Sequence, residues 1–324
     1  YFVYANRHGD IHFIHNAQLP VRAPGWNWQQ YLPGDRSSLI WREYHHTSSL
    51  PQVTNPSSGF VHSANQTPFN VSEAKDNPVR SEAPENGGWQ TRMTNRATRG
   101  LELFDAFGEI SFDEAWQLKH DNRYSINYRG MTFLNEVIGL PGSSDQQAQA
   151  IDILANWDRG TDKDNRGAAL GVCVLAAEWQ AESGGTRNPD ANEILDECID
   201  QTLDIGGRLD PKWGDVNRHG RDGKHWPVAG GPDTLRAIYS RQLEGDDYLT
   251  AVAGDGLYYF IRWTPDGEQS VLGTHQYGND MTNPDSPHYL DQAEDYSNEI
   301  LHEPLYTADS RRGRVTRRYT VRSR

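Results

Sequence analysis

The chain has 324 residues, which is long enough to bury a sizeable core, and its 10 Trp and 15 Tyr exclude a disordered chain. The net charge of −14 argues against nucleic acid and anionic membrane surfaces as partners, because both require a basic footprint. The sequence contains no run of 18 apolar residues, so we also expect no membrane-spanning helix.

Two segments near the start of the chain form a predicted hairpin. Residues 1–5 and 11–15 are rich in strand-forming residues, and the turn sequence NRHGD separates them. The first residues do not resemble a signal peptide but a strand that runs into a turn, with no Met before it, so we expect the chain to begin inside a larger protein. The aromatic residues of the long loop 23–49 are expected to pack it onto the body. Five early histidines have no metal-ligand spacing: His8, His12, His15, His45 and His46.

The stretch 50–69, LPQVTNPSSGFVHSANQTPF, predicts a tight loop. Asn55-Pro56 begins a turn, Gly59 can adopt positive φ, and residues 60–61 are predicted to form a short strand. The side chain of Asn65 on such a loop has two interpretations. It can satisfy nearby backbone groups, as loop asparagines commonly do. It can also direct its NH2 group at one point in space, as an oxyanion-stabilising donor must.

The middle of the chain predicts a succession of short helices laid against a sheet. One helix is expected over 91–107, with Thr94 or Asn95 near its start, and a capping box at Ser111 and Glu114 begins the next. Apolar spacing predicts further helices over 145–157, 168–180 and 192–203, and a strand pair over 254–263 and 269–273.

The two cysteines, Cys173 and Cys198, each lie on a predicted helix, and their spacing fits no zinc motif. They could be two buried thiols or one disulfide, and we expect buried thiols. A later Gly-rich stretch contains Asp215, His219, Asp222 and His225, but these four residues lack a regular ligand spacing.

Three motifs resemble the penicillin acylase family of N-terminal nucleophile hydrolases. The first is the family pattern N-P-x-S-G-(aromatic)-x-x-N-x-N-x-(S/T)-P, which residues 55–68 match except at Ser63. The second comprises the phrases W-G-x-V-(N/H)-R and P-(V/L)-x-G-G-(P/G)-x-T-L within 213–235. The third is S-P-H-(Y/F)-x-D-Q at 286–292. The resemblance extends from Tyr1 to about Tyr306.

The resemblance implies roles for individual residues. Asn65 corresponds to the oxyanion-hole asparagine of the family, and Arg96 to the helix arginine that orients it, with Arg99 as the rival one turn later. Some members bind calcium through an aspartate in the region that corresponds to residues 70–88. Asp76 is the nearest candidate for that aspartate, although calcium takes six to eight oxygen ligands. Arg262 occupies the position where many members have a glutamate that orients a histidine near the nucleophile.

The resemblance also implies the fold and the activity. The expected fold is α+β, a partial αββα sandwich of the N-terminal nucleophile hydrolases with a helical insertion. The nucleophile is expected upstream of Tyr1, as the N-terminal Ser of the family's β chain, released by self-cleavage of a precursor. The expected activity is hydrolysis of linear N-acyl amides, of the EC 3.5.1 type, with β-lactam side chains, acyl-homoserine lactones or acylated peptides as substrates.

The expected partners are a small N-acyl substrate, the upstream part of the β chain and an α chain from the same precursor. The resemblance implies no required cofactor and a periplasmic or secreted location. We expect one partial domain over 1–324, with core strands and loops in 1–70, a mainly helical region in 91–205, and closing strands and loops in 206–324. This segment alone is expected to be inactive. The alternatives are an inactive remnant, or a glycan-binding module or glycosidase, to which the many Trp and acidic residues are suited.

Overall fold

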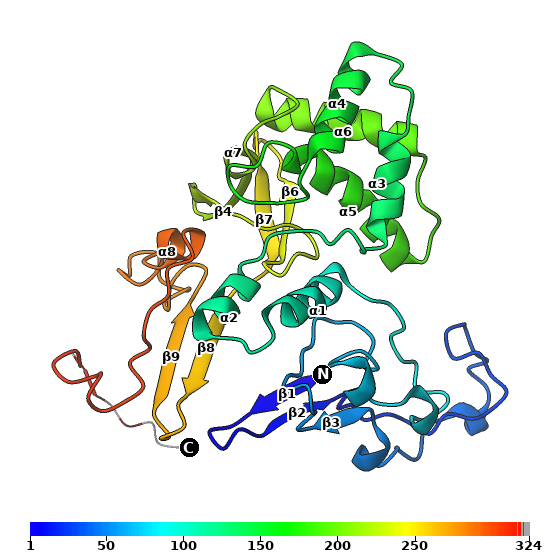
Figure 1. The fold of residues 1–324 in the computed structure, drawn as a ribbon, viewed down its shortest axis with the longest axis vertical. Helices are drawn as coiled ribbons and strands as arrows, with labels where there is room; N and C mark the ends of the chain where they lie inside the picture. Colours follow the sequence, from blue (N-terminus) through cyan, green and yellow to red (C-terminus); the bar gives the residue numbers. More distant parts are fainter. Residues whose placement is uncertain (316, 319, 321–324) are drawn as a thin grey trace.

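The structure is a computed structural model, and it describes residues 1–315, 317–318 and 320. It contains both helices and small sheets, so the predicted α+β class is confirmed. Figure 1 shows the N-terminal strands at one end of the molecule and a cluster of helices at the other, with α1 (Asn95–Phe107) and α2 (Phe112–Lys119) between them. The described strands form sheets of three, four and two strands, and the partial αββα sandwich stays a prediction.

The N-terminal sheet contains the predicted hairpin. Strand β1 (Phe2–Ala5) pairs antiparallel with β2 (Ile11–Ile14), which pairs with β3 (Gln52–Thr54). The predicted strand at residues 60–61 is wrong. Phe60 instead stacks on Phe104, with ring centroids 4.2 Å apart, and its carbonyl accepts a hydrogen bond from the Ser72 hydroxyl rather than from a neighbouring strand.

Trp28 of the long aromatic loop contacts other residues of the same loop. Trp28 donates its ring N–H to the Ala23 carbonyl and lies 6.3 Å from Trp41, but Tyr31 is fully exposed. Short 3-10 helices occur in this loop and in the segments after it: η1 (Ser37–Leu39), η2 (Thr47–Ser49), η3 (Ala74–Asp76) and η4 (Arg80–Glu82).

The predicted helices are present, and their capping residues explain where two of them begin. The Thr94 hydroxyl accepts from the Ala97 N–H at the start of α1, and Ser111 forms the predicted capping box with Glu114 at the start of α2. Three further helices, α3, α7 and α8, were not predicted. The bounds are α1 (Asn95–Phe107), α2 (Phe112–Lys119), α3 (Gly130–Ile138), α4 (Asp145–Asn156), α5 (Ala168–Gly184), α6 (Ala191–Gly206), α7 (Trp213–Val216) and α8 (Ala293–Ser297).

Helices α3 to α6 enclose the largest apolar core of the molecule. The Trp157 ring is buried against Gly171 of α5, where any side chain would collide with it. The expectation of free thiols is wrong, because Cys173 of α5 and Cys198 of α6 form a disulfide with a Cα–Cα distance of 5.7 Å. The two helices pack side by side with these residues facing each other, a pairing that the sequence separation of 25 did not reveal.

A four-stranded sheet follows the helices, in the order β5-β4-β7-β6. A two-stranded hairpin, β8-β9, completes the strands. The single strand expected over 254–263 is divided, because the chain turns after Gly254, where the Asp255 N–H donates to the Ala237 carbonyl at 2.7 Å. The bounds are β4 (Asn217–Arg221), β5 (Lys224–Pro227), β6 (Ile238–Gln242), β7 (Leu249–Gly254), β8 (Tyr258–Trp263) and β9 (Gln269–Thr274).

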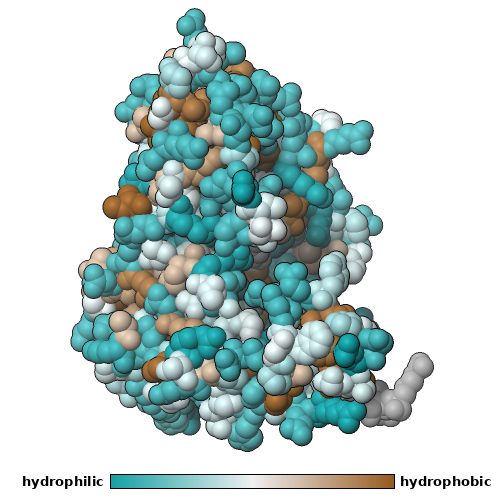
Figure 2. All heavy atoms as spheres, turned by 90° about the vertical axis from the view of Figure 1, so that its right-hand side faces the viewer, coloured by the Kyte–Doolittle hydropathy of each residue, from teal (hydrophilic) through white to brown (hydrophobic). Residues whose placement is uncertain are grey.

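The visible surface is mainly hydrophilic, as the composition predicts. Figure 2 shows one face, on which hydrophobic residues are scattered among hydrophilic ones. Within the described part of the chain, none of the helices has the length and apolar character that crossing a membrane requires.

Candidate active site

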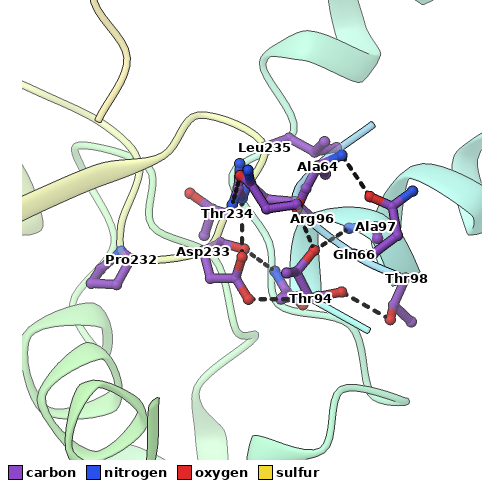
Figure 3. Close-up of polar contacts among 12 residues, drawn as sticks. Ala64, Gln66, Thr94, Arg96, Ala97, Thr98, Pro232, Asp233, Thr234 and Leu235 are labelled. Carbon is purple, nitrogen blue, oxygen red and sulfur yellow. Dashed lines mark hydrogen bonds and ion pairs between the residues drawn. The ribbon is translucent and has the colours of Figure 1, made fainter. Parts of the chain in front are cut away.

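The loop that carries Asn65 is held by hydrogen bonds on both sides of that residue. Asn65 itself adopts a positive φ of 63°, which asparagine tolerates better than most residues. The Ala64 N–H donates to the side chain of the buried Gln66 at 2.6 Å, and the Ala64 carbonyl accepts from the Thr94 hydroxyl at 2.9 Å. Because Thr94 also caps α1, the start of this helix and the Asn65 loop are fixed to each other (Figure 3).

Arg96, in the first turn of α1, connects Asn65 to a buried carboxylate. Its Nη2 donates to the Asn65 side-chain oxygen at 3.0 Å, and its Nε donates to Asp233 Oδ1 at 3.0 Å. A guanidinium can only donate, so the oxygen of the Asn65 carboxamide must face it. Among the described residues the Asn65 NH2 group has no partner, which leaves it available to an acceptor outside this network.

Sequence reasoning missed Asp233. It lies in the turn between β5 and β6, 2% exposed, with a positive φ of 60°. Its Oδ2 accepts from the Asn95 N–H at 2.7 Å, and its backbone carbonyl accepts from the Asn95 side chain at 2.9 Å. Burial raises the pKa of Asp233, against the opposing effects of Arg96 and the Asn95 N–H. The only sequence signal was an acidic residue directly after the Gly-Gly-Pro of the second family motif.

The turn that carries Asp233 is itself rigid. Gly230 has a φ of 100°, and a side chain there would collide with the Arg236 carbonyl. The Thr234 hydroxyl lies within hydrogen-bonding distance of the Gly231 N–H and of the Arg236 carbonyl, and the fully buried Arg236 side chain donates to the Tyr296 carbonyl at 2.7 Å. Figure 3 shows Asp233 directed from this turn toward the start of α1.

The rival residue Arg99 faces a different partner. Its guanidinium makes two hydrogen bonds to Asp121, at 2.9 and 2.8 Å, and forms an ion pair with Glu102. The structure therefore brings Arg96, and not Arg99, to Asn65. Arg262 lies on β8 opposite Ser270, with an exposed side chain.

The calcium candidate Asp76 supports the base of the Asn65 loop. Its carboxylate accepts from the Ser57 hydroxyl and from the Ser58 N–H, the latter at 2.9 Å. Burial acts to raise the pKa of Asp76, but these hydrogen bonds outweigh it, so the pKa lies below its usual range. Among the described residues, no group of three or more His, Cys, Asp or Glu side chains is arranged to hold a metal ion. Because Asp76 is a single carboxylate with serine partners, calcium binding stays a prediction.

Comparisons with known proteins agree with the motifs. The family model for penicillin amidase matches residues 1–313. Penicillin G acylase of Escherichia coli is 26% identical over 158 residues, which is 48% of this chain but only 17% of that protein. The thermostable penicillin G acylase from Alcaligenes faecalis, in its orthorhombic form, has a similar fold, with a TM-score of 0.55 and 15% identity over 99% of this chain and 67% of its own. The predicted resemblance is thus confirmed, and the chain belongs to the penicillin amidase family.

Proposed function

We propose that the protein containing this chain hydrolyses the amide bond of N-acyl compounds. Family membership supports amide hydrolysis, and one observation in the site carries the proposal. The Asn65 side-chain oxygen is engaged by Arg96, while its NH2 group has no partner among the described residues. An oxyanion hole needs a donor that is oriented before the reaction and is not engaged in a hydrogen bond within the protein.

The proposed mechanism is acyl transfer through a covalent ester. The nucleophile would be the N-terminal Ser of the family's β chain, outside the printed sequence, and its oxygen would attack the amide carbonyl carbon. The Asn65 NH2 group would donate to the resulting oxyanion, together with an upstream backbone N–H. The amine then leaves with a proton, and water hydrolyses the ester to release the carboxylic acid. Arg96 and Asp233 take part as positioning residues, since they reach the reaction only through Asn65.

The substrate classes that we propose are β-lactam side chains, acyl-homoserine lactones and acylated peptides. β-Lactam side chains as substrates agree with the names of the relatives, which are both penicillin G acylases. We also propose a periplasmic or secreted protein made as a precursor, and the Cys173–Cys198 disulfide supports this location because disulfides persist mainly in oxidising compartments. The family match does not favour an inactive remnant, a glycan-binding module or a glycosidase.

The test is the Asn65→Ala variant of the full-length protein, assayed with an N-acyl p-nitroanilide. Removing one oxyanion donor typically lowers kcat by about 10²–10³-fold, and we expect a loss of that size with an unchanged thermal midpoint. Asn188→Ala, in the exposed loop between α5 and α6, is the matched control and should retain full turnover. Turnover close to that of the wild type in Asn65→Ala would contradict the proposed role of Asn65.

A further inference from the structure

A cavity separate from the candidate active site lies next to the turn that carries Asp233. Its volume is about 280 Å³, and it is enclosed by the disulfide-linked helices α5 and α6 and by strands β6 and β7. Neither Asn65 nor Arg96 lines it. Its interior is apolar and buried, and is formed mainly by Val172, Ile194, Ile205, Ile238 and Leu249.

Three further residues of the cavity lining are polar and exposed. They are Gln180 of α5, Glu197 of α6 and Arg241 of β6. The pairing of β6 with β7 shifts register between Tyr239 and Ser240, and such a bulge re-aims the residues that follow it. Within the described chain, the guanidinium of Arg241 has neither a hydrogen-bond nor an ion-pair partner. The cavity therefore combines an apolar interior with an uncompensated cation.

We propose that this cavity binds a small monocarboxylic acid with an apolar tail. The tail would lie among the apolar side chains of α5, α6 and β6. Pockets for small molecules are in general lined mainly by apolar side chains. The carboxylate would bind Arg241, because the planar guanidinium matches carboxylate geometry with two parallel hydrogen bonds. Glu197, the one acidic residue in the lining, disfavours a second negative charge on the ligand.

The location of the cavity connects it to the site described above. Pro232 lines the cavity, and the next residue is Asp233, which holds Arg96. If the proposed function holds, the acid released by amide hydrolysis has the same chemical character as this ligand, and it would bind beside the turn that orients Asn65. Binding itself does not depend on that function.

Titration calorimetry of the full-length protein with sodium hexanoate tests the proposal. We expect saturable binding that Arg241→Gln weakens at least tenfold, while the matched control Arg187→Gln, in the exposed loop after α5, leaves the Kd unchanged. Ala176→Leu extends a side chain into the cavity and should also weaken hexanoate binding at least tenfold. 1-Hexanol, which has the same tail and no charge, should bind at least tenfold more weakly than hexanoate.

Three results would overturn the proposal. Absence of hexanoate binding would exclude the site, and equal binding of hexanol would exclude recognition of a carboxylate. Binding that neither Arg241→Gln nor Ala176→Leu weakens would place hexanoate elsewhere, for example in the active site. Arg241 is exposed, so its variant is expected to fold and to give a result even if Ala176→Leu does not. Failure of the proposed function would show in turnover and leave these binding constants unaffected.

Discussion

Arg96 donates one hydrogen bond to Asn65 and another to Asp233, so a single guanidinium connects an exposed loop to a buried turn. Asn65 is on a loop, where a side chain has conformational freedom. Its orientation follows from Arg96, and the orientation of Arg96 follows from Asp233, which is anchored by Asn95. The geometry of the candidate site therefore depends on an aspartate 168 residues after Asn65 in the sequence.

Arg96→Lys should lower turnover while the corresponding change at Arg99 does not. A lysine ammonium is one point charge and cannot replace the fork that spans Asn65 and Asp233. A displacement of about 1 Å at a reacting centre can cost about 10²-fold in rate, and we expect a loss of that order in kcat. Arg99→Lys alters the contacts to Asp121 and Glu102 but none to Asn65, and serves as the control. Equal losses in the two variants would show that the positioning is not specific to Arg96.

Asp233→Asn should lower both kcat and stability. The amide cannot accept hydrogen bonds from both Arg96 and the Asn95 N–H, and the guanidinium loses its buried counter-charge. Breaking a buried pair typically costs about 3–5 kcal/mol, and we expect the lower end because the Arg96 side chain is 21% exposed. Urea denaturation measures the loss, with the exposed Asp105→Asn of α1 as control. A fully active Asp233→Asn variant would refute the positioning role.

At the scale of elements, two helices show that local sequence can specify where a helix begins. Helices α1 and α2 begin where capping side chains occur, which is why the sequence predicted their starts. Helix α3 was missed, and Arg129 at its N-cap contributes no side-chain hydrogen bond to mark its start. The division between β7 and β8 was also missed, because the turn after Gly254 depends on the distant Ala237 carbonyl.

The disulfide between α5 and α6 should contribute measurably to stability. Cross-links that close loops of this size typically stabilise a protein by about 2–4 kcal/mol, chiefly by restricting the unfolded chain. We expect the double variant Cys173→Ser/Cys198→Ser to lose an amount in this range in urea denaturation. Because these are the only two cysteines, a reductant should destabilise the wild type and leave the double variant unaffected. A reductant effect of equal size on both proteins would contradict the assignment.

At the scale of the whole molecule, buried histidines make stability depend on pH. Burial lowers the pKa of His62, His120 and His219 to about 4, so these side chains stay neutral in the folded protein. Between about pH 6.5 and 4 the unfolded chain binds protons that the folded chain does not, so the free energy of unfolding falls as the pH falls. Asp233, Glu178 and Glu299 have raised pKa values and act in the opposite sense.

His219→Gln isolates one of these contributions. The Gln amide can still donate to the Ala293 carbonyl, as His219 Nε2 does at 2.9 Å, but it does not titrate. We expect the stability lost between pH 7 and pH 5 to be smaller in the variant by an amount on the order of 2 kcal/mol. His8→Gln, in the exposed turn of the first hairpin, should leave the loss unchanged. Urea denaturation at the two pH values measures the difference, and identical losses in wild type and His219→Gln would disprove this origin.

The sequence by itself determined the family, the N-terminal hairpin and most of the helices. These features depend on residues close together in the chain, as in the motif at 55–68 and the caps at Thr94 and Ser111. Asn65 and Arg96 were also predicted from sequence as site residues, but only through the resemblance, since a loop asparagine and a helix arginine carry no distinctive signal of their own.

The tertiary structure decided what depends on contacts between distant residues. It selected Arg96 over Arg99 and revealed Asp233, because a turn between two late strands packs against the start of α1. It also joined Cys173 to Cys198, because α5 and α6 lie side by side in one apolar core. Local propensity and residue spacing do not predict such pairings, because the free energy that stabilises them comes from burial and packing across the folded chain.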